Sequence, residues 1–441
     1  MSGDAAQESS PGWAGRVAFS EESGGVAYRP DELLVGGERG LEVATRVFPS
    51  LGAEDEVFPG RATGQFYRMR GDVDPVEAVH ELRLEGVVAQ PNHVLFAHGE
   101  CGCGPHPAQR WAAGLQGSPF YASPFYASPF YASPFYASPF YASAVSPSPF
   151  YASELRANGR RRSSARPAEP PSLTLATYGE KHRWPRVVVL DTGFAAEGLR
   201  PAVLAWIQPG RADWERPDED QGGFLDPAGG HGTYICGLLA GLARESNIVP
   251  VRVLSTMGDG DEATIAARID ELAKTGGADL LNLSFGGYTL ERPHVLAAAV
   301  RRVQSAGTVV VASAGNDATC RPTYPASLPG VVGVGALGPG GPAPFTNYGR
   351  WVRACAPGVD VVAPFFSEFI GDKPTEGGID PDDFHGWARW SGTSFAAPAV
   401  VAALAREMHV SGVSAKDAVA RVVDAPSLLR IPDLGTVVNI Q

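Results

Sequence analysis

The second half of this chain alternates short apolar runs, rich in Val and Leu, with Ala-rich stretches at helical spacing. The apolar runs cover 187–190, 251–254, 280–283, 309–312 and 331–334, and helical stretches cover 264–274 and 295–304. Runs this short and apolar are typical of strands buried on both faces of a parallel sheet. Residues 172–441 are therefore predicted to form an α/β domain with a mostly parallel sheet and helices on both faces, and with its site at the carboxyl ends of strands.

Residues 30–100 carry a different pattern, which predicts a small α+β module. Short strands are expected at 33–35, 65–69 and 87–96. Asp74 and Pro75 are suited to the N-cap and first residue of a helix between these strands. Residues 1–29 are polar and aperiodic, and are expected to be a disordered leader.

Residues 101–171 are predicted to be a low-complexity linker. The unit Ser-Pro-Phe-Tyr-Ala occurs six times, without a gap over 118–142 and once more at 148–152. A proline in every unit excludes a helix interior or a central strand, so an extended polyproline-like tether is expected. We interpret the array as a spacer, with docking of its aromatic side chains into a groove as the alternative. The arginine-rich stretch 160–166 follows it.

Charge and composition exclude several classes of function. The formal net charge of −12 repels nucleic-acid phosphates and anionic membrane surfaces. No run of 18 apolar residues predicts a membrane span, and the first thirty residues do not resemble a Sec-type signal. Five cysteines, an odd number, do not describe a disulfide framework. These features predict a cytoplasmic protein, with export by another route left open.

Three short segments supply an acid, a base and a nucleophile. Asp191 follows the apolar run 187–190, His231 precedes a small-residue helical stretch, and Ser394 precedes another. A serine hydroxyl is a weak nucleophile at neutral pH, so it needs an imidazole in hydrogen-bond reach and a carboxylate to orient that imidazole. Asn316 ends a further buried strand, and the start of the helix at Ser394 favours a developing oxyanion.

Together these segments resemble the subtilisin-like serine protease family, peptidase S8, over about residues 185–410. The chain order Asp, His, Ser is that of the family. The resemblance implies a serine endopeptidase that needs no cofactor and acts on protein or peptide substrates. It also implies that Asp191 orients the imidazole, His231 acts as general base and then acid, and Ser394 is the nucleophile. Asn316 and the backbone N–H of Ser394 would then form the oxyanion hole.

The resemblance extends to the substrate groove. Ser284, Phe285, Gly286 and Gly287 resemble the family's substrate-binding strand, which pairs with the peptide main chain. Ala314, Gly315 and Asp317, beside Asn316, are further candidate substrate-binding residues, with Asp317 expected near the S1 mouth. Asp259 and Asp261 are expected on the opposite wall, where acids favour basic side chains. Exposed loop acids without this role are the alternative.

The module at 30–100 resembles the propeptides of this family, which assist folding and then inhibit by placing their C-terminal end in the cleft. It and the linker are thus expected partners in cis. The linker separates module and enzyme by some seventy residues, which allows either a zymogen cut within 99–170 or an inhibitory domain that stays tethered. A separate α+β binding domain is the alternative.

Two other interpretations stay open. The chain could keep the fold as a catalytically silent peptide-binding module, although every position needed for the chemistry is filled. The acidic clusters at 218–220 and 380–383 could hold Ca²⁺, but neither has an ordered ligand spacing, so no metal site is predicted.

Overall fold

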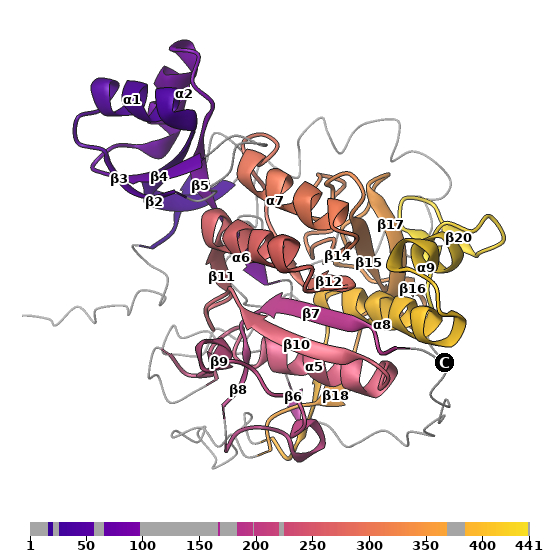
Figure 1. The fold of residues 1–441 in the computed structure, drawn as a ribbon. Helices are drawn as coiled ribbons and strands as arrows, with labels where there is room; N and C mark the ends of the chain where they lie inside the picture. Colours follow the sequence, from indigo (N-terminus) through magenta and orange to yellow (C-terminus); the bar gives the residue numbers. More distant parts are fainter. Residues whose placement is uncertain are drawn as a thin grey trace, which may run out of the picture.

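A computed structural model describes most of the chain in two packed parts (Figure 1). The described residues are 16–20, 26–56, 66–97, 166–167, 183–196, 198–219, 225–367 and 384–439. The predictions made for the repeat array and for the acids at 380–383 lie outside these residues.

The larger part is built on a nine-stranded sheet with strand order β10-β7-β12-β14-β15-β17-β21-β20, to which β16 is added on β15. Neighbours from β10 to β21 pair in parallel, whereas β16 and β20 pair antiparallel. The strands are β7 (Arg186–Asp191), β10 (Asn247–Arg252), β12 (Leu280–Leu283), β14 (Val309–Ser313), β15 (Val332–Gly338), β16 (Gly341–Pro342), β17 (Val352–Pro357), β20 (Arg430–Ile431) and β21 (Gly435–Val437). β7, β12 and β14 are almost fully buried, as expected for central parallel strands.

Helices cover both faces of this sheet (Figure 1). α6 (Glu262–Thr275) and α7 (His294–Ser305) lie on one face, and α5 (His231–Leu242) and α8 (Thr393–Ser411) lie on the other. α6 begins at the N-cap Asp261, whose side chain accepts from Thr264 N–H, and ends at the left-handed Gly276. The α/β fold class predicted from the sequence is confirmed.

Shorter elements complete the larger part. They are β8 (Phe194–Ala195), β9 (Trp214–Glu215), β18 (Val361–Pro364), β19 (Trp387–Trp390), α9 (Ala415–Val422) and the 3-10 turns Ala202–Leu204 and Arg211–Asp213. β6 (Arg166–Pro167) pairs with β19, so the end of the linker contacts the strand that leads to the Ser394 loop.

The N-terminal module is an antiparallel sheet with two helices. Its elements are β1 (Ala18–Ser20), β2 (Val26–Gly36), α1 (Gly37–Val47), β3 (Gly52–Glu56), β4 (Phe66–Arg70), α2 (Pro75–Leu84) and β5 (Ala89–Ala97). Asp74 caps α2 as predicted, accepting from Val76 N–H and Glu77 N–H. The ordered module begins earlier than expected, because β1 and the start of β2 lie within the 1–29 segment taken as a leader. Val17, Val26 and Ala27 are buried there.

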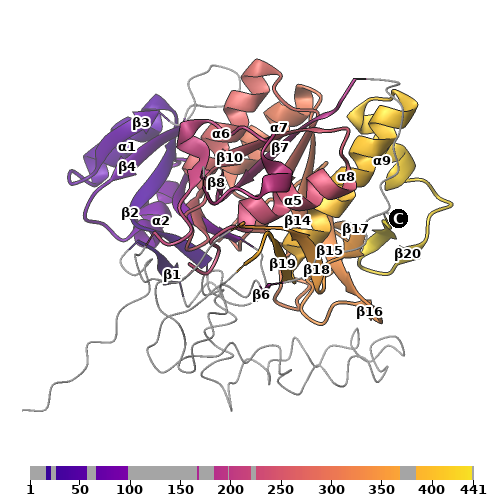
Figure 2. The same ribbon diagram turned by 90° about the horizontal axis from the view of Figure 1, so that it is seen from below.

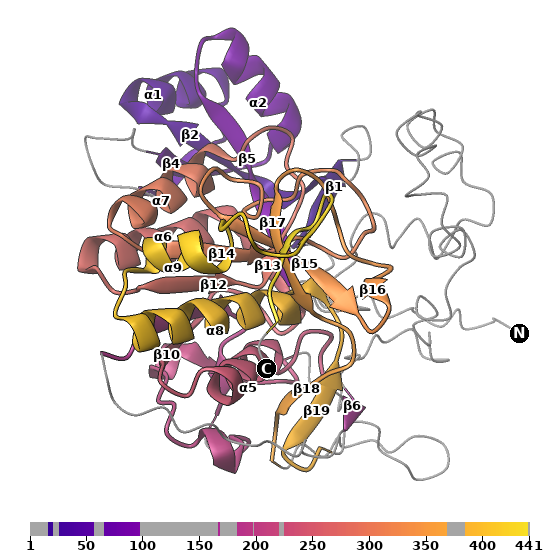
Figure 3. The same cartoon turned by 90° about the vertical axis from the view of Figure 1, so that its right-hand side faces the viewer.

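The sheet of the module continues into the larger part (Figures 2 and 3). β5 is flanked by β11 (Asp259–Asp261) and β13 (Phe285–Gly286), both antiparallel to it. Phe96 lies opposite Asp259 on one side and Gly286 on the other, and Ala97 lies opposite Phe285. The last residues of the module thus form the middle strand between two strands of the larger part.

Among the described residues, none of the helices combines the length and apolarity that a bilayer crossing requires. The same residues contain no grouping of three or more His, Cys, Asp or Glu side chains arranged to hold a metal ion.

Candidate active site

Asp191 lies at the carboxyl end of β7, where the sequence placed it. Its side chain is fully buried. Oδ1 lies 2.7 Å from His231 Nδ1 and also accepts from Thr192 N–H at 2.8 Å. A carboxylate held by two donors has a fixed orientation, so Asp191 in turn fixes the plane of the imidazole ring.

His231 is the first residue of α5 and is also fully buried. Because Asp191 accepts at Nδ1, the Nδ1–H tautomer is the one that fits, and Nε2 is then the basic nitrogen. Nε2 has no hydrogen-bond partner among the described residues. The ring lies against Trp390, edge-on with centroids 5.5 Å apart, and against Phe395 at 5.4 Å. Aromatic walls on two sides keep water from this imidazole.

Gly230 sets the turn that presents His231. Its φ of +79° is in the left-handed region, and an added Cβ would lie 2.3 Å from the Phe365 ring. Only glycine meets both conditions. The turn into α5 thus explains why glycine precedes His231.

Ser394 is the second residue of α8 and is fully buried. Its Oγ donates to the carbonyl oxygen of Ser284 at 2.8 Å, and Ser284 Oγ donates to the carbonyl oxygen of Ser394 at the same distance. The hydroxyl therefore points to Ser284 and not to the imidazole in this structure. The bond between Ser394 and His231 that the triad chemistry requires needs a rotation about the Cα–Cβ bond of Ser394.

Asn316 follows β14 and lies beside the start of α8. Its Oδ1 accepts from Thr393 N–H at 3.0 Å and from Thr393 Oγ–H at 2.9 Å. Two donors on the amide oxygen settle which end of the side chain is which, so the NH₂ end points away from Thr393. The role of Asn316 as an oxyanion donor stays a prediction.

The predicted substrate strand does pair with an extended segment. Phe285 and Gly286 form β13 and pair with β5, while Ser284 binds the nucleophile loop as described above. Gly287 lies against the same segment, since a Cβ there would meet Leu95 Cδ2 at 3.1 Å and the Val94 carbonyl at 3.2 Å. These residues form one wall of a groove that β5 fills.

The residues around Asn316 are held by Asn347. Asn347 Nδ2 donates to the Ala314 carbonyl at 2.9 Å, and its Oδ1 accepts from Asp317 N–H at 2.9 Å. Gly315 has a φ of +106° and donates to Thr393 Oγ at 3.1 Å. The Asp317 carboxylate accepts from Tyr288 Oη at 3.0 Å. These contacts give residues 314–317 a structural role, and their part in binding substrate stays a prediction.

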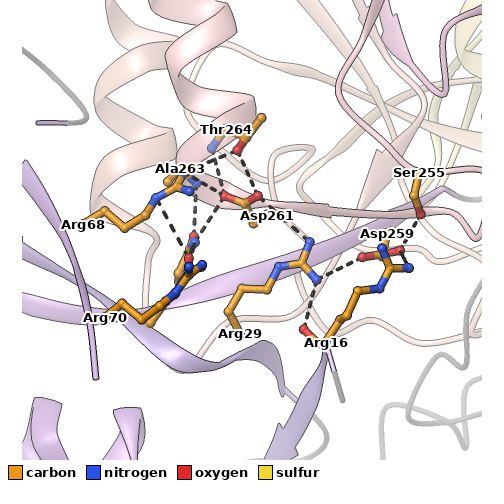
Figure 4. A network of polar contacts seen from close by, with 11 residues as sticks. Arg16, Arg29, Arg68, Arg70, Ser255, Asp259, Asp261, Ala263 and Thr264 are labelled. Carbon is orange, nitrogen blue, oxygen red and sulfur yellow. Dashed lines mark hydrogen bonds and ion pairs between the residues drawn. The ribbon is translucent and has the colours of Figure 1, made fainter. Parts of the chain in front are cut away.

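Asp259 and Asp261, on the other wall, bind arginines of the module (Figure 4). Asp259 is nearly fully buried, and accepts from Arg29 at 3.0 Å and from Arg16 at 3.3 Å. Asp261 accepts from Arg68 at 3.3 Å. Burial opposes ionisation of Asp261, but the Thr264 N–H and the charges of Arg68 and Arg29 outweigh it and lower its pKa. Both acids are thus paired with guanidinium groups of the module.

Side chains of the module also accept hydrogen bonds from backbone N–H groups at the starts of two helices of the larger part. Asn92 Oδ1 accepts from Ala263 N–H in α6 at 3.1 Å, and Gln90 Oε1 accepts from His294 N–H in α7 at 2.7 Å. Glu262, fully buried, accepts from Gln90 Nε2 and lies 2.7 Å from His93 Nδ1. The contact between β5 and the two helices is therefore polar and buried, and its hydrogen bonds fix the position of β5 along them.

Sequence reasoning missed two residues of this site. Trp390 covers the imidazole, and its place four residues before Ser394 is a local signal that could have suggested it. Glu215 is fully buried on β9, and accepts from Gly230 N–H at 2.9 Å. Burial, and to a lesser extent the charge of Asp191, raises the pKa of Glu215 to about 8. No sequence pattern marks this glutamate, because its burial comes from the packing of distant segments.

Comparison with known proteins places this arrangement in a family. The profile of the Peptidase S8 subtilase family matches residues 185–419. The chain belongs to the subtilase family, as the resemblance in the sequence indicated.

Individual proteins of known class are similar in sequence to parts of this chain. Subtilisin-like protease 2 of Pseudogymnoascus destructans is 34% identical over 226 residues, which cover 48% of this chain and 50% of the relative. The thermophilic serine proteinase of Bacillus sp. is 34% identical over 211 residues, which cover 44% and 47%. The chain thus spans about half the length of these curated relatives. A crystal structure of a cold adapted subtilisin-like serine proteinase overlays with a TM-score of 0.47 and 23% identity, covering 63% of this chain and 95% of that one.

Proposed function

We propose that this chain is a serine endopeptidase that cleaves peptide bonds through an acyl-enzyme at Ser394. Membership of the subtilase family supports the reaction class. The observation that carries the assignment of residues is the buried 2.7 Å contact between Asp191 and His231, with the basic Nε2 of the imidazole turned away from Asp191.

In the proposed mechanism, the hydroxyl of Ser394 turns from the Ser284 carbonyl to His231 Nε2. Oγ attacks the carbonyl carbon of the scissile bond while its proton passes to Nε2, and Asp191 stabilises the imidazolium. The negative oxygen accepts from Asn316 Nδ2 and from Ser394 N–H in the first turn of α8. His231 then gives its proton to the leaving amine. Water, activated by the same imidazole, hydrolyses the ester and frees Ser394.

The N-terminal module is proposed to inhibit this site in cis. β5 occupies the position between β11 and β13 that a substrate strand would take. Residues Leu95 and Ala97 pack into the main core of the larger part, together with Phe285. Because the paired strand reaches Ala97, we propose that self-cleavage occurs at a bond in the linker, beyond Ala97.

Intact-mass and N-terminal mapping of the wild type and Ser394→Ala, after identical incubation, tests this function. We expect a cut between residues 99 and 170 in the wild type only, because the variant lacks the hydroxyl that attacks the peptide bond. Glu81→Ala, an exposed change on α2, is the matched control and should be cut like the wild type. A cut that persists in Ser394→Ala would contradict the proposal, and two uncut chains would favour the silent module.

Charge reversal in the module should release the inhibition. Arg29→Asp leaves the buried carboxylate of Asp259 facing a second acid, and losing a partner of a buried charge pair costs about 2–5 kcal/mol. The initial peptidase rate of the uncut chain should therefore rise roughly thirty-fold or more. Arg46→Asp, which breaks the exposed pair with Glu85 inside the module, is the control. Equal rates for the two variants would show that the Arg29 contact does not hold the module in the groove.

A further inference from the structure

A buried carboxyl group that the proposed mechanism does not use lies beside the Asp191–His231 pair. Glu215 is on β9, which pairs with β8 just after the Asp191 turn, and Ala195 is its direct partner. Its Oε1 accepts from Gly230 N–H, the residue before His231. Glu215 thus touches both the segment that follows the acid and the turn that presents the base.

Two threonines complete a set of bonds between these segments. Thr192 Oγ accepts from Gly232 N–H at 3.0 Å, and Thr233 Oγ accepts from Ala195 N–H at 2.8 Å. Thr233 Oγ also lies 3.4 Å from Glu215 Oε2, within reach of a long hydrogen bond. Two hydrogen bonds therefore join the residues after Asp191 to the first turn of α5, and Glu215 adds a link from β9 to Gly230.

The surroundings of Glu215 favour its neutral form. The Gly230 N–H and the Thr233 hydroxyl contact it directly, and in the described part of the chain no side chain of opposite charge forms a hydrogen bond or ion pair with it. Burial is the largest effect and raises the pKa of Glu215. Hydrogen bonds from Thr192 and Gly230 and the charge of Arg252 oppose this shift, and the charge of Asp191 adds to it. A buried carboxyl group in such a place holds its proton through neutral pH.

We propose that Glu215 is a positioning residue, whose buried carboxyl group binds Gly230 N–H, fixes the Gly230 turn and thereby holds the His231 ring against Asp191. The proposal rests on the proposed function and deepens it. The structure supplies a physical reason: α5 has no other side chain at its N-cap, since Gly230 has none. When Glu215 ionises, its charge faces the Asp191 carboxylate, and the two repel.

The test compares Glu215→Gln with Glu215→Ala in the full chain. Glutamine keeps the acceptor for Gly230 N–H and stays neutral, so kcat at pH 7 should remain within about three-fold of the wild type. Alanine leaves that N–H without a partner, so kcat should fall at least ten-fold with little change in KM. The wild type should lose activity as pH rises through about 8, and Glu215→Gln should lack that step. Glu219→Gln, on the same loop and paired with Arg252, is the control and should keep the step.

A measurement that does not depend on activity separates this inference from the proposed function. The low-field NMR signal of the proton between His231 Nδ1 and Asp191 should persist in Glu215→Gln, and should broaden or vanish in Glu215→Ala. Equal kcat values or equal NMR spectra for the two variants would overturn the positioning role. So would an alkaline step that survives in Glu215→Gln. Inactivity of the wild type with the NMR pattern intact would instead contradict the proposed function alone.

Discussion

His231→Ala is expected to lower kcat/KM by about 10⁴–10⁶ and to stop self-cleavage. The imidazole is the one base whose orientation is fixed by Asp191, at 2.7 Å, in a site closed by Trp390 and Phe395. Without it the Ser394 hydroxyl has no group that accepts its proton, and only binding and oxyanion stabilisation would remain. The measurement is single-turnover hydrolysis of a peptide ester.

His409→Ala is the matched control for this variant. His409 is another buried histidine, near the other end of α8, and neither ring nitrogen has a described partner. The His409→Ala variant should keep most of the activity, although it too loses a buried imidazole ring. Thermal unfolding of both variants checks that the fold survives. If His231→Ala and His409→Ala lose activity equally, a general effect on folding explains both.

Asn316→Ala is expected to lower kcat by about 10²–10³ with little effect on KM, because an oxyanion donor acts mainly in the transition state. The amide oxygen accepts hydrogen bonds from Thr393, so the NH₂ end is the part that would donate to an oxyanion. Steady-state kinetics on a peptide amide measure the effect.

Asn316→Asp separates the donor from the packing of this side chain. Aspartate keeps an acceptor for Thr393 N–H and Oγ–H but supplies no amide donor. It should lose kcat as alanine does. Full activity in Asn316→Asp would contradict the assignment of Asn316 to the oxyanion hole.

Local sequence signals predicted much of the fold because the core is built from them. The run at 187–190 became β7, and the helical stretch at 264–274 became α6 with Asp261 as its cap. The same signals did not predict α1 of the module, which begins at Gly37 and contains β-branched residues of low helix propensity. Ala44 of α1 is buried in the hydrophobic core of the module, so packing against the sheet stabilises this helix.

The sequence predicted which residues form the candidate site, but not how their side chains are oriented. Asp191, His231 and Asn316 are each positioned by the end of a strand or the start of a helix, so their motifs located them. The direction of the Ser394 hydroxyl was not predictable, because a buried hydroxyl binds whichever carbonyl packing brings near, here that of Ser284. Glu215 could not be found for a related reason: its neighbours are distant in sequence.

Mapping a fluorophosphonate label by mass spectrometry tests the central claim most directly, since the reagent reacts only with an activated serine. The wild type and Arg29→Asp, in which the groove is expected to open, should carry the label on Ser394, and Arg29→Asp should react faster. His231→Ala and Ser394→Ala should stay unlabelled. Absence of label from both wild type and Arg29→Asp would contradict an activated nucleophile at Ser394.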